Sequence, residues 1–281
     1  MSLALFTAWL DETIMFPTEI VDLILGFVHS YEDYTTLETC SAIFPQLVDC
    51  HLYSHIILPT YSPVQPTNPF SAGNYVVDPT KFSLTLIDRP HIANYVRVVC
   101  IFVGTPLAHD LPVISSILTM LSQINSITLS THRRLTWSIL DPGFRTAFQN
   151  TIRLPSLKEV NILNISSFPL SVFDSCNNLK RLLLFNPCTG GEAVTMSSYP
   201  RLCSLDVKSQ TDMTMSRIVR WMETNTLQSL ALLIDSIELI TPFGTLLEAC
   251  SATLVNLEFK YCWCGVLCFL SCNGSRSLTA I

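Results

Sequence analysis

The stretch LKRLLLF, residues 179–185, decides the fold of this chain. Leu179, Leu182 and Leu184 follow the pattern L-x-x-L-x-L. Successive side chains of a β-strand point to opposite faces, so Leu182 and Leu184 share one face and the residues beside them share the other. The pattern therefore predicts a strand with one buried face.

The same pattern occurs six more times when Ile, Val or Phe is allowed at the apolar positions. The first positions of successive copies are 28, 33, 22, 23, 25 and 27 residues apart. Leucine-rich units of roughly 20–29 residues each contain a strand and a helix or looser segment. One such unit cannot bury its own apolar side, so we expect the units to stack. The copies are Val96/Val99/Ile101, Ile124/Ile127/Leu129, Leu157/Val160/Ile162, Leu179/Leu182/Leu184, Leu202/Leu205/Val207, Leu227/Leu230/Leu232 and Leu254/Leu257/Phe259.

Short helices are expected between these strands, because the intervening segments are amphipathic. The expected fold class is α/β: a curved leucine-rich-repeat solenoid with a parallel sheet on its concave face and helices on its convex face. The expected helices are TKFSLTLID (80–88), PVISSILTML (112–121), FRTAFQ (144–149), SVFDSC (171–176), MSRIVRWME (215–223) and PFGTLLEAC (242–250).

The outward side chains of the strands would form a concave surface that a target protein can contact. Leu163, Leu183 and Phe185 are expected to form an exposed apolar patch beside Arg181, a composition typical of binding hot spots. In the alternative interpretation, a loop or the convex side covers this patch. The predicted target-binding residues are Glu159, Asn161, Leu163, Arg181, Leu183, Phe185, Asp206 and Lys208, continued by Ser229, Leu233, Glu258 and Lys260.

The N-terminal part of the chain has a different pattern, typical of short helices. In MFPTEIVDLILGFV, residues 15–28, Pro17 suits a first helical turn and Glu19 opposes the helix dipole. Residues 35–38 (TTLE) match a capping box and predict a second helix, and a third is expected over about 46–56. The apolar face of the first helix is Ile20, Leu23, Ile24 and Phe27.

Four regions are therefore expected along the chain. Residues 1–58 form a helical module, and residues 59–78 form a linker that contains the proline-rich PTYSPVQPTNP. Residues 79–262 form the repeats, and residues 263–281 form an irregular tail. A repeat array normally ends in a polar capping unit, so a truncated chain or a palmitoylated tail would be alternative explanations of this end.

The three segments FPTEIVDLIL, TLETCSAIF and HLYSHIILP resemble an F-box of the fungal type, over about residues 15–58. Phe16 stands where the family usually has Leu, and Leu47 stands where Trp is common. The resemblance implies binding to the Skp-type adaptor of an SCF ubiquitin ligase. Without that resemblance, the module would be a helical cap on the repeats. The implied adaptor-binding residues are Phe16, Pro17, Ile20, Ile24 and Leu25.

Fungal F-box proteins commonly carry leucine-rich repeats, so the two resemblances agree. Together they imply a substrate-recognition subunit that binds the adaptor, and through it a cullin ligase, with one end and an unknown target protein with the other. The alternative is a leucine-rich-repeat interaction scaffold that has no ubiquitin-ligase role.

The composition favours a protein of the cytoplasm or nucleus. Hydrophobic residues make up 49% and charged residues 14% of the chain, and no apolar run reaches the roughly 18–20 residues of a membrane span. The initial LALFTAWL lacks a preceding basic residue, so no secretory signal is expected, and the 11 cysteines suit a reducing compartment. Residues 1–80 hold nine acidic residues and neither Lys nor Arg. Neither residues 1–80 nor the rest of the chain contains a dense patch of basic residues. We therefore expect neither nucleic acid nor a membrane as a partner.

Catalytic and metal-binding motifs are not found in the sequence. It contains no P-loop, G-x-S-x-G, H-E-x-x-H or G-x-G-x-x-G motif, so we expect neither an enzyme nor a bound cofactor. His51 and His55 are four residues apart but lack a third ligand in the sequence nearby. Cys262, Cys264, Cys268 and Cys272 do not have the paired spacing of zinc sites, so no metal is expected.

Overall fold

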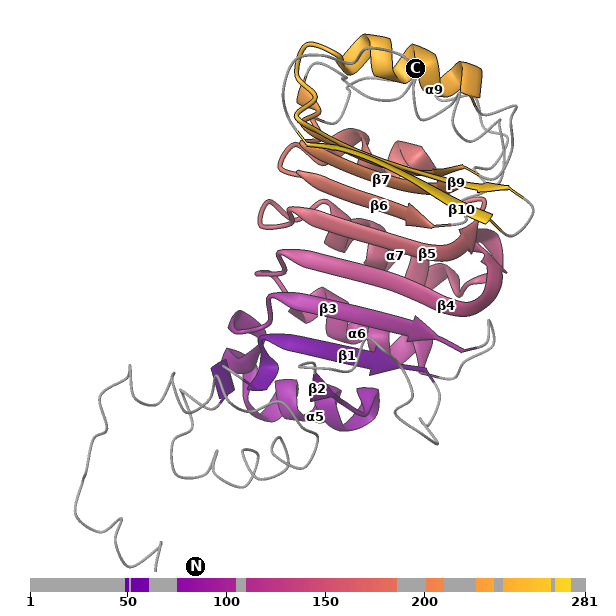
Figure 1. Ribbon diagram of the computed structural model, residues 1–281. Helices are drawn as coiled ribbons and strands as arrows, with labels where there is room; N and C mark the ends of the chain where they lie inside the picture. The colour runs from indigo at the N-terminus through magenta and orange to yellow at the C-terminus, as the bar shows by residue number, and fades with distance from the viewer. Residues whose placement is uncertain are drawn as a thin grey trace, which may run out of the picture.

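The computed structural model describes residues 49–50, 52–60, 75–104, 110–185, 201–209, 226–234, 240–263 and 266–273. These residues form an α/β structure around one ten-stranded sheet, whose order is β2-β1-β3-β4-β5-β6-β7-β8-β9-β10 (Figure 1). Neighbouring strands from β2 to β9 are parallel, and β10 is antiparallel to β9. The strands are β1 His55–Pro59, β2 Tyr75–Val76, β3 Val98–Val103, β4 Ser126–Thr136, β5 Glu159–Ser166, β6 Arg181–Phe185, β7 Ser204–Ser209, β8 Ser229–Ile234, β9 Asn256–Trp263 and β10 Val266–Asn273.

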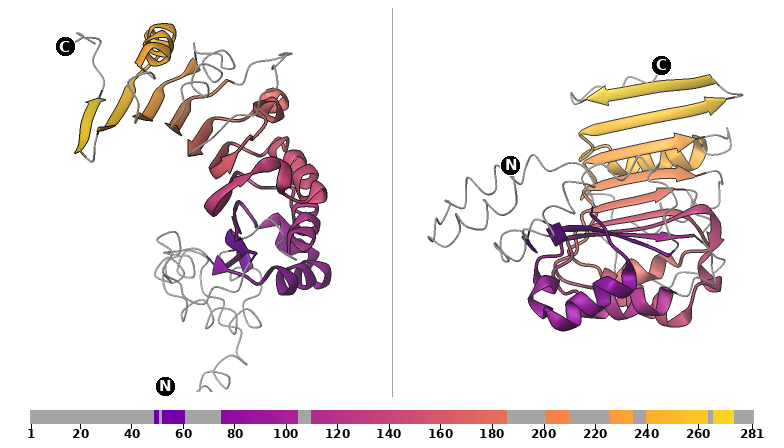
Figure 2. Two further views of the ribbon diagram at one scale, coloured as in Figure 1. Left: turned by 90° about the vertical axis from the view of Figure 1, so that its right-hand side faces the viewer. Right: turned by 90° about the horizontal axis from the view of Figure 1, so that it is seen from below.

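The helices lie on one side of this sheet. Figure 2 shows the strands along the inner side of an arc and the helices along its outer side. Because a helix is about 10 Å wide and strands are about 4.8 Å apart, a helical outer layer requires the sheet to curve in this direction. The helices are α5 Pro79–Asp88, α6 Leu111–Met120, α7 Pro142–Ile152 and α9 Ile240–Cys250, with 3₁₀ helices η1 Pro90–Asn94, η2 Trp137–Ile139 and η3 Leu170–Ser175.

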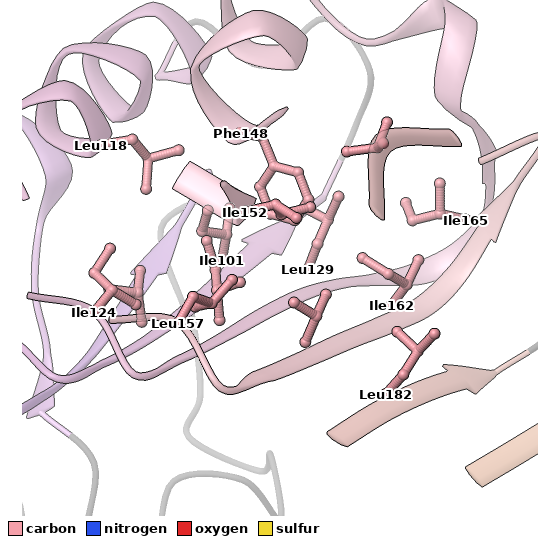
Figure 3. Packing of buried hydrophobic residues seen from close by; sticks show 14 of the residues in the cluster. Ile101, Leu118, Ile124, Leu129, Phe148, Ile152, Leu157, Ile162, Ile165 and Leu182 are labelled. Atoms are coloured by element: carbon pink, nitrogen blue, oxygen red, sulfur yellow. The ribbon is translucent and has the colours of Figure 1, made fainter. Parts of the chain in front are cut away.

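The apolar positions of the repeated pattern make up the core, as predicted. In the first six copies, every one of the three pattern residues is at most 2% exposed. In the seventh copy, Leu254 and Leu257 are partly buried against the same cluster. Strand residues such as Leu129 and Ile162 point toward the side where Phe148 of α7 lies (Figure 3).

At the start of each strand from β3 to β9, the same pair of backbone hydrogen bonds connects the strand to the preceding one. The backbone N–H groups of Arg97 and Val98 both donate to the Ser54 carbonyl, and those of Asn125 and Ser126 both donate to the Arg97 carbonyl. The arrangement occurs seven times, with N···O distances between 2.7 and 3.1 Å. A carbonyl oxygen has two lone pairs, so one oxygen satisfies two donors. We call this arrangement the shared-carbonyl joint.

The three helices α5, α6 and α7 begin directly after an Asp and with a Pro in their first two positions. Asp78 accepts a hydrogen bond from the Lys81 N–H at 2.9 Å, and Asp141 accepts one from the Phe144 N–H at 2.8 Å. These caps satisfy N–H groups that the first turn leaves unpaired. The helices predicted over 80–88, 112–121, 144–149 and 242–250 are confirmed, that over 171–176 is the 3₁₀ helix η3, and that over 215–223 lies outside the described residues.

Aromatic rings fill the space between the end of β4 and α7. Trp137 lies 4.8 Å from Phe168 and 5.9 Å from Phe148, measured between ring centroids. Phe148 also contacts Phe144 at 5.9 Å, and Phe168 contacts Phe173 at 5.6 Å. All five rings are buried, so this aromatic cluster belongs to the core.

The predicted boundary between the helical module and the repeats is wrong at the third helix. Residues 55–59 form β1, which pairs with β3, and only the described positions 49, 50, 52 and 53 are helical. Tyr53, Ile56 and Leu58 occupy the pattern positions of a further unit. This unit was missed from the sequence because Tyr53 is 43 residues before Val96, a much longer step than those between the other units. Strand β2 likewise lies within the predicted linker, and residues 61–74 are outside the described range.

The predicted irregular tail is also partly wrong. Residues 266–273 form β10, which pairs along its whole length with β9. Two residues separate these strands, a spacing that suits a tight antiparallel connection. Among the helices that the structure describes, none is both long and apolar enough to cross a bilayer.

Candidate protein-binding face

The side chains between the buried pattern positions form the face of the sheet that is turned away from the helices. We call this the inner face. Strand pairing places its residues in three rows that run across the strands. The first row is His55, Val98, Ser126, Glu159, Arg181, Ser204, Ser229 and Asn256; the second is Ile57, Cys100, Thr128, Asn161, Leu183, Asp206, Ala231 and Glu258; the third is Pro59, Phe102, Ser130, Leu163, Phe185, Lys208, Leu233 and Lys260.

All predicted target-binding residues fall within these rows. Glu159 pairs with Arg181 in the first row, whereas Leu163 pairs with Phe185 in the third. Asn161, Leu183 and Asp206 are consecutive in the second row. Lys208 and Lys260 belong to the third row by strand pairing, and their side chains lie outside the described range. The function of these residues stays a prediction.

The predicted exposed patch is half-buried and divided between two rows. Leu163 and Phe185 are neighbours, but Leu183 lies in another row between Asn161 and Asp206. All three apolar side chains have intermediate exposure. Adjacent strands are only about 4.8 Å apart, so neighbouring side chains in a row cover each other's flanks.

A chain of polar side chains connects three strands of the inner face, β4, β5 and β6. The Asn161 amide nitrogen donates to the Thr128 hydroxyl and to the Glu159 carboxylate, each at 3.1 Å. The other Glu159 oxygen lies 3.8 Å from an Arg181 guanidinium nitrogen. Arg181 is well exposed, so this ion pair orients side chains more than it stabilises the fold.

Cys100 continues this polar chain onto β3. Burial raises the pKa of the Cys100 thiol, a hydrogen bond with Thr128 lowers it, and the nearby Glu159 charge raises it. The net direction is upward, which keeps the thiol protonated and unreactive at neutral pH. Cys100 therefore serves the inner face as a small, weakly polar side chain.

Two parts of the inner face were missed by sequence reasoning. The prediction began at β5 although the same alternation continues through Ser126, Thr128 and Ser130 of β4 and could have revealed them. It also missed an irregular segment after Ser130, where β4 and β5 lose their regular register. That segment has no motif and follows from the pairing of the two strands.

The described residues contain neither the predicted adaptor-binding residues nor a group of side chains that could bind a metal ion. The predicted adaptor-binding residues Phe16, Pro17, Ile20, Ile24 and Leu25 lie outside them. Within the described ranges, no group of three or more His, Cys, Asp or Glu residues could hold a metal ion. His55, half of the His51/His55 pair, is an exposed residue of β1.

The described geometry is thus a curved sheet whose accessible face combines a polar chain and half-buried apolar side chains. Such a surface suits contact with a macromolecule more than it suits enclosure of a small ligand. The chain matches no family model, no curated protein and no solved structure.

Proposed function

We propose that this chain is the substrate-recognition subunit of an SCF-type ubiquitin ligase, with an N-terminal F-box and leucine-rich repeats. The observation that carries the proposal is the repeated unit itself. Seven successive strands use one joint and present the alternate residues in rows, and six of them bury the same three positions. That regularity supports the leucine-rich-repeat interpretation, and such arrays commonly bind other proteins through an extended concave surface.

In this proposal the inner face binds the target, and the chain performs no bond chemistry. Half-buried apolar side chains and the exposed Arg181 would make the contacts that typically dominate protein interfaces. The complex would hold the target close to a separate ubiquitin-transferring enzyme. Raising the local concentration of a reactant accelerates its transfer without a catalytic residue in this chain.

Adaptor binding is proposed from the F-box resemblance of residues 15–58. The apolar positions Phe16, Ile20, Ile24 and Leu25, together with Pro17, would contact the Skp-type adaptor. The cytosol or nucleus, where disulfides are rare, is the compartment that we propose for this complex.

The test is co-purification of the full chain with a Skp-type adaptor. We expect a one-to-one complex with the unmodified chain and its loss in the variant Pro17→Ala/Ile20→Asp/Ile24→Asp. The matched control is Leu84→Asp/Ile87→Asp on α5, which introduces the same two charges at positions that are 57% and 65% exposed. The control should keep the adaptor. A folded unmodified chain that fails to bind would contradict the proposal.

The second candidate is a leucine-rich-repeat scaffold that has no role in ubiquitin transfer. It is favoured by the inner face, which spans β1 to β9 and whose rows need no adaptor. Protein binding through this face without adaptor binding would support the scaffold.

A further inference from the structure

Strands β4 and β5 extend beyond their neighbours and lose their regular pairing at one place. Ser130 pairs with Leu163, and the next regular pair is Leu135 with Ile165. Four residues of β4 therefore lie opposite the single residue Asn164. We call residues 131–134 of β4 the bulge.

Hydrogen bonds on both strands hold the bulge in place. The Asn164 amide nitrogen donates to the Thr131 carbonyl at 2.9 Å, and the Thr131 hydroxyl donates to the Asn164 carbonyl at 3.3 Å. The Thr131 hydroxyl also donates to the Arg133 carbonyl. Asn164 has a φ of 61°, a left-handed conformation that Asn tolerates better than most residues. The bulge is therefore an ordered part of the sheet.

The bulge turns toward the inner face. The His132 ring packs edge-on against Phe102 of the third row, with ring centroids 4.6 Å apart. His132, Arg133 and Arg134 are all exposed, whereas Thr131 is buried. Arg133 and Arg134 therefore follow Ser130 along β4, and Ser130 is the third-row residue that pairs with Leu163.

Charge is unevenly distributed over the rows. The acidic residues of the inner face, Glu159, Asp206 and Glu258, belong to the first and second rows. The third row contains apolar residues, one Ser, and Lys208 and Lys260, with no acidic residue. Within the described part of the chain, Arg133 forms no ion pair.

We propose that the third row and the bulge bind an extended acidic segment of the target, with Arg133 and Arg134 contacting its carboxylates and Leu163 and Phe185 contacting its apolar side chains. Guanidinium groups suit carboxylates because they donate in a planar fork. The proposal rests on the protein-binding role proposed for the inner face and is independent of adaptor binding.

The test measures binding of the full chain to an array of short extended peptides in matched pairs, one with Glu and one with Gln at the same positions, each also carrying Leu. We expect the Glu members to bind at least about fivefold more tightly, since charge-assisted hydrogen bonds add to apolar contact. The variant Arg133→Glu/Arg134→Glu should abolish this preference, and Arg133→Gln/Arg134→Gln should reduce it.

The control is Arg153→Glu/Lys158→Glu, which changes the net charge equally at exposed basic residues near the opposite ends of the strands. It should keep the preference for Glu. A preference that survives Arg133→Glu/Arg134→Glu, or an array with no bound peptide, would overturn the proposal. Tighter binding of a single-stranded oligonucleotide through the same arginines would also overturn it, in favour of a nucleic-acid surface. The adaptor co-purification tests the F-box proposal, and the peptide array tests the acidic-segment proposal. Failure of one experiment therefore leaves the result of the other unchanged.

Discussion

The units β4–α7–β5 and β5–η3–β6 are neighbours with the same joint and different outer layers. Their pattern positions are 33 and 22 residues apart, from Ile124 to Leu157 and from Leu157 to Leu179. The longer unit contains an α-helix of 11 residues, and the shorter one contains a six-residue 3₁₀ helix. Both nevertheless place two N–H groups on one carbonyl of the preceding strand.

The comparison shows that strand register is independent of the connection. The buried pattern residues and the joint fix each strand, while the connection only has to cover the outer apolar side. A helix rises about 1.5 Å per residue, so an 11-residue helix with its two turns requires a longer step than a short 3₁₀ segment. The 27-residue step from Leu227 to Leu254 also contains an α-helix, α9.

The core of the longer unit should be the more sensitive to truncation. Phe148 of α7 lies among Trp137, Phe144 and Phe168, so we expect Phe148→Ala to lower the free energy of unfolding by about 3–5 kcal/mol. Phe173→Ala in η3 should fall at the lower end of that range. Chemical denaturation measures both, and a larger loss for Phe173→Ala would reverse the comparison.

Helix capping should matter in the longer unit alone. Asp141→Ala removes the side chain that accepts from the Phe144 N–H, and we expect a loss of about 1 kcal/mol in the free energy of unfolding. The η3 helix has no side-chain cap, so Ser171→Ala at its exposed second position should stay within about 0.5 kcal/mol. Equal losses in thermal unfolding would show that α7 does not depend on its cap.

The smallest expected effects concern polar residues that precede the pattern. Asn178 donates to the Pro155 carbonyl at 2.8 Å, and Ser156 donates to the Ser122 carbonyl at 3.1 Å. Both bonds are exposed, so Asn178→Ala and Ser156→Ala should each lower the free energy of unfolding by about 0.5–1 kcal/mol. Each donor directly precedes a pattern Leu and bonds the carbonyl two residues before the first pattern residue of the previous unit, so the two losses should agree. A clear difference in denaturation midpoints would show that the connection influences these side-chain bonds.

The sequence was sufficient to predict strands β3 to β9 and the alternation of buried and inner-face residues along them, because burial repeats at fixed positions. The burial of Leu182 and Leu184 follows from the alternation of side chains along a strand. The same alternation places Asn161 and Phe185 on the inner face. The start of α7 also follows from a local signal, Asp141 and Pro142.

The remaining features depend on contacts between distant residues. The helix predicted over about 46–56 runs into strand β1. Residues 51–58 (HLYSHIIL) have apolar residues at helical as well as strand spacing, and the step to the next unit is long. The bulge follows from how β4 and β5 pair, and Thr131 carries no signal of its contact with Asn164. The buried carboxylate of Asp49 pairs with Arg89 forty positions later, which no local pattern indicates.

The shared-carbonyl joint has a consequence for how such a chain can change in length during evolution. Each unit accepts two N–H groups from the next unit and donates two to the previous one, so every boundary has the same chemistry. Duplication or deletion of a whole unit would recreate the same boundary and extend or shorten the inner face without a new core. A break within a unit would instead leave backbone donors of the joint without their carbonyl, so growth by whole units is the route that the backbone favours.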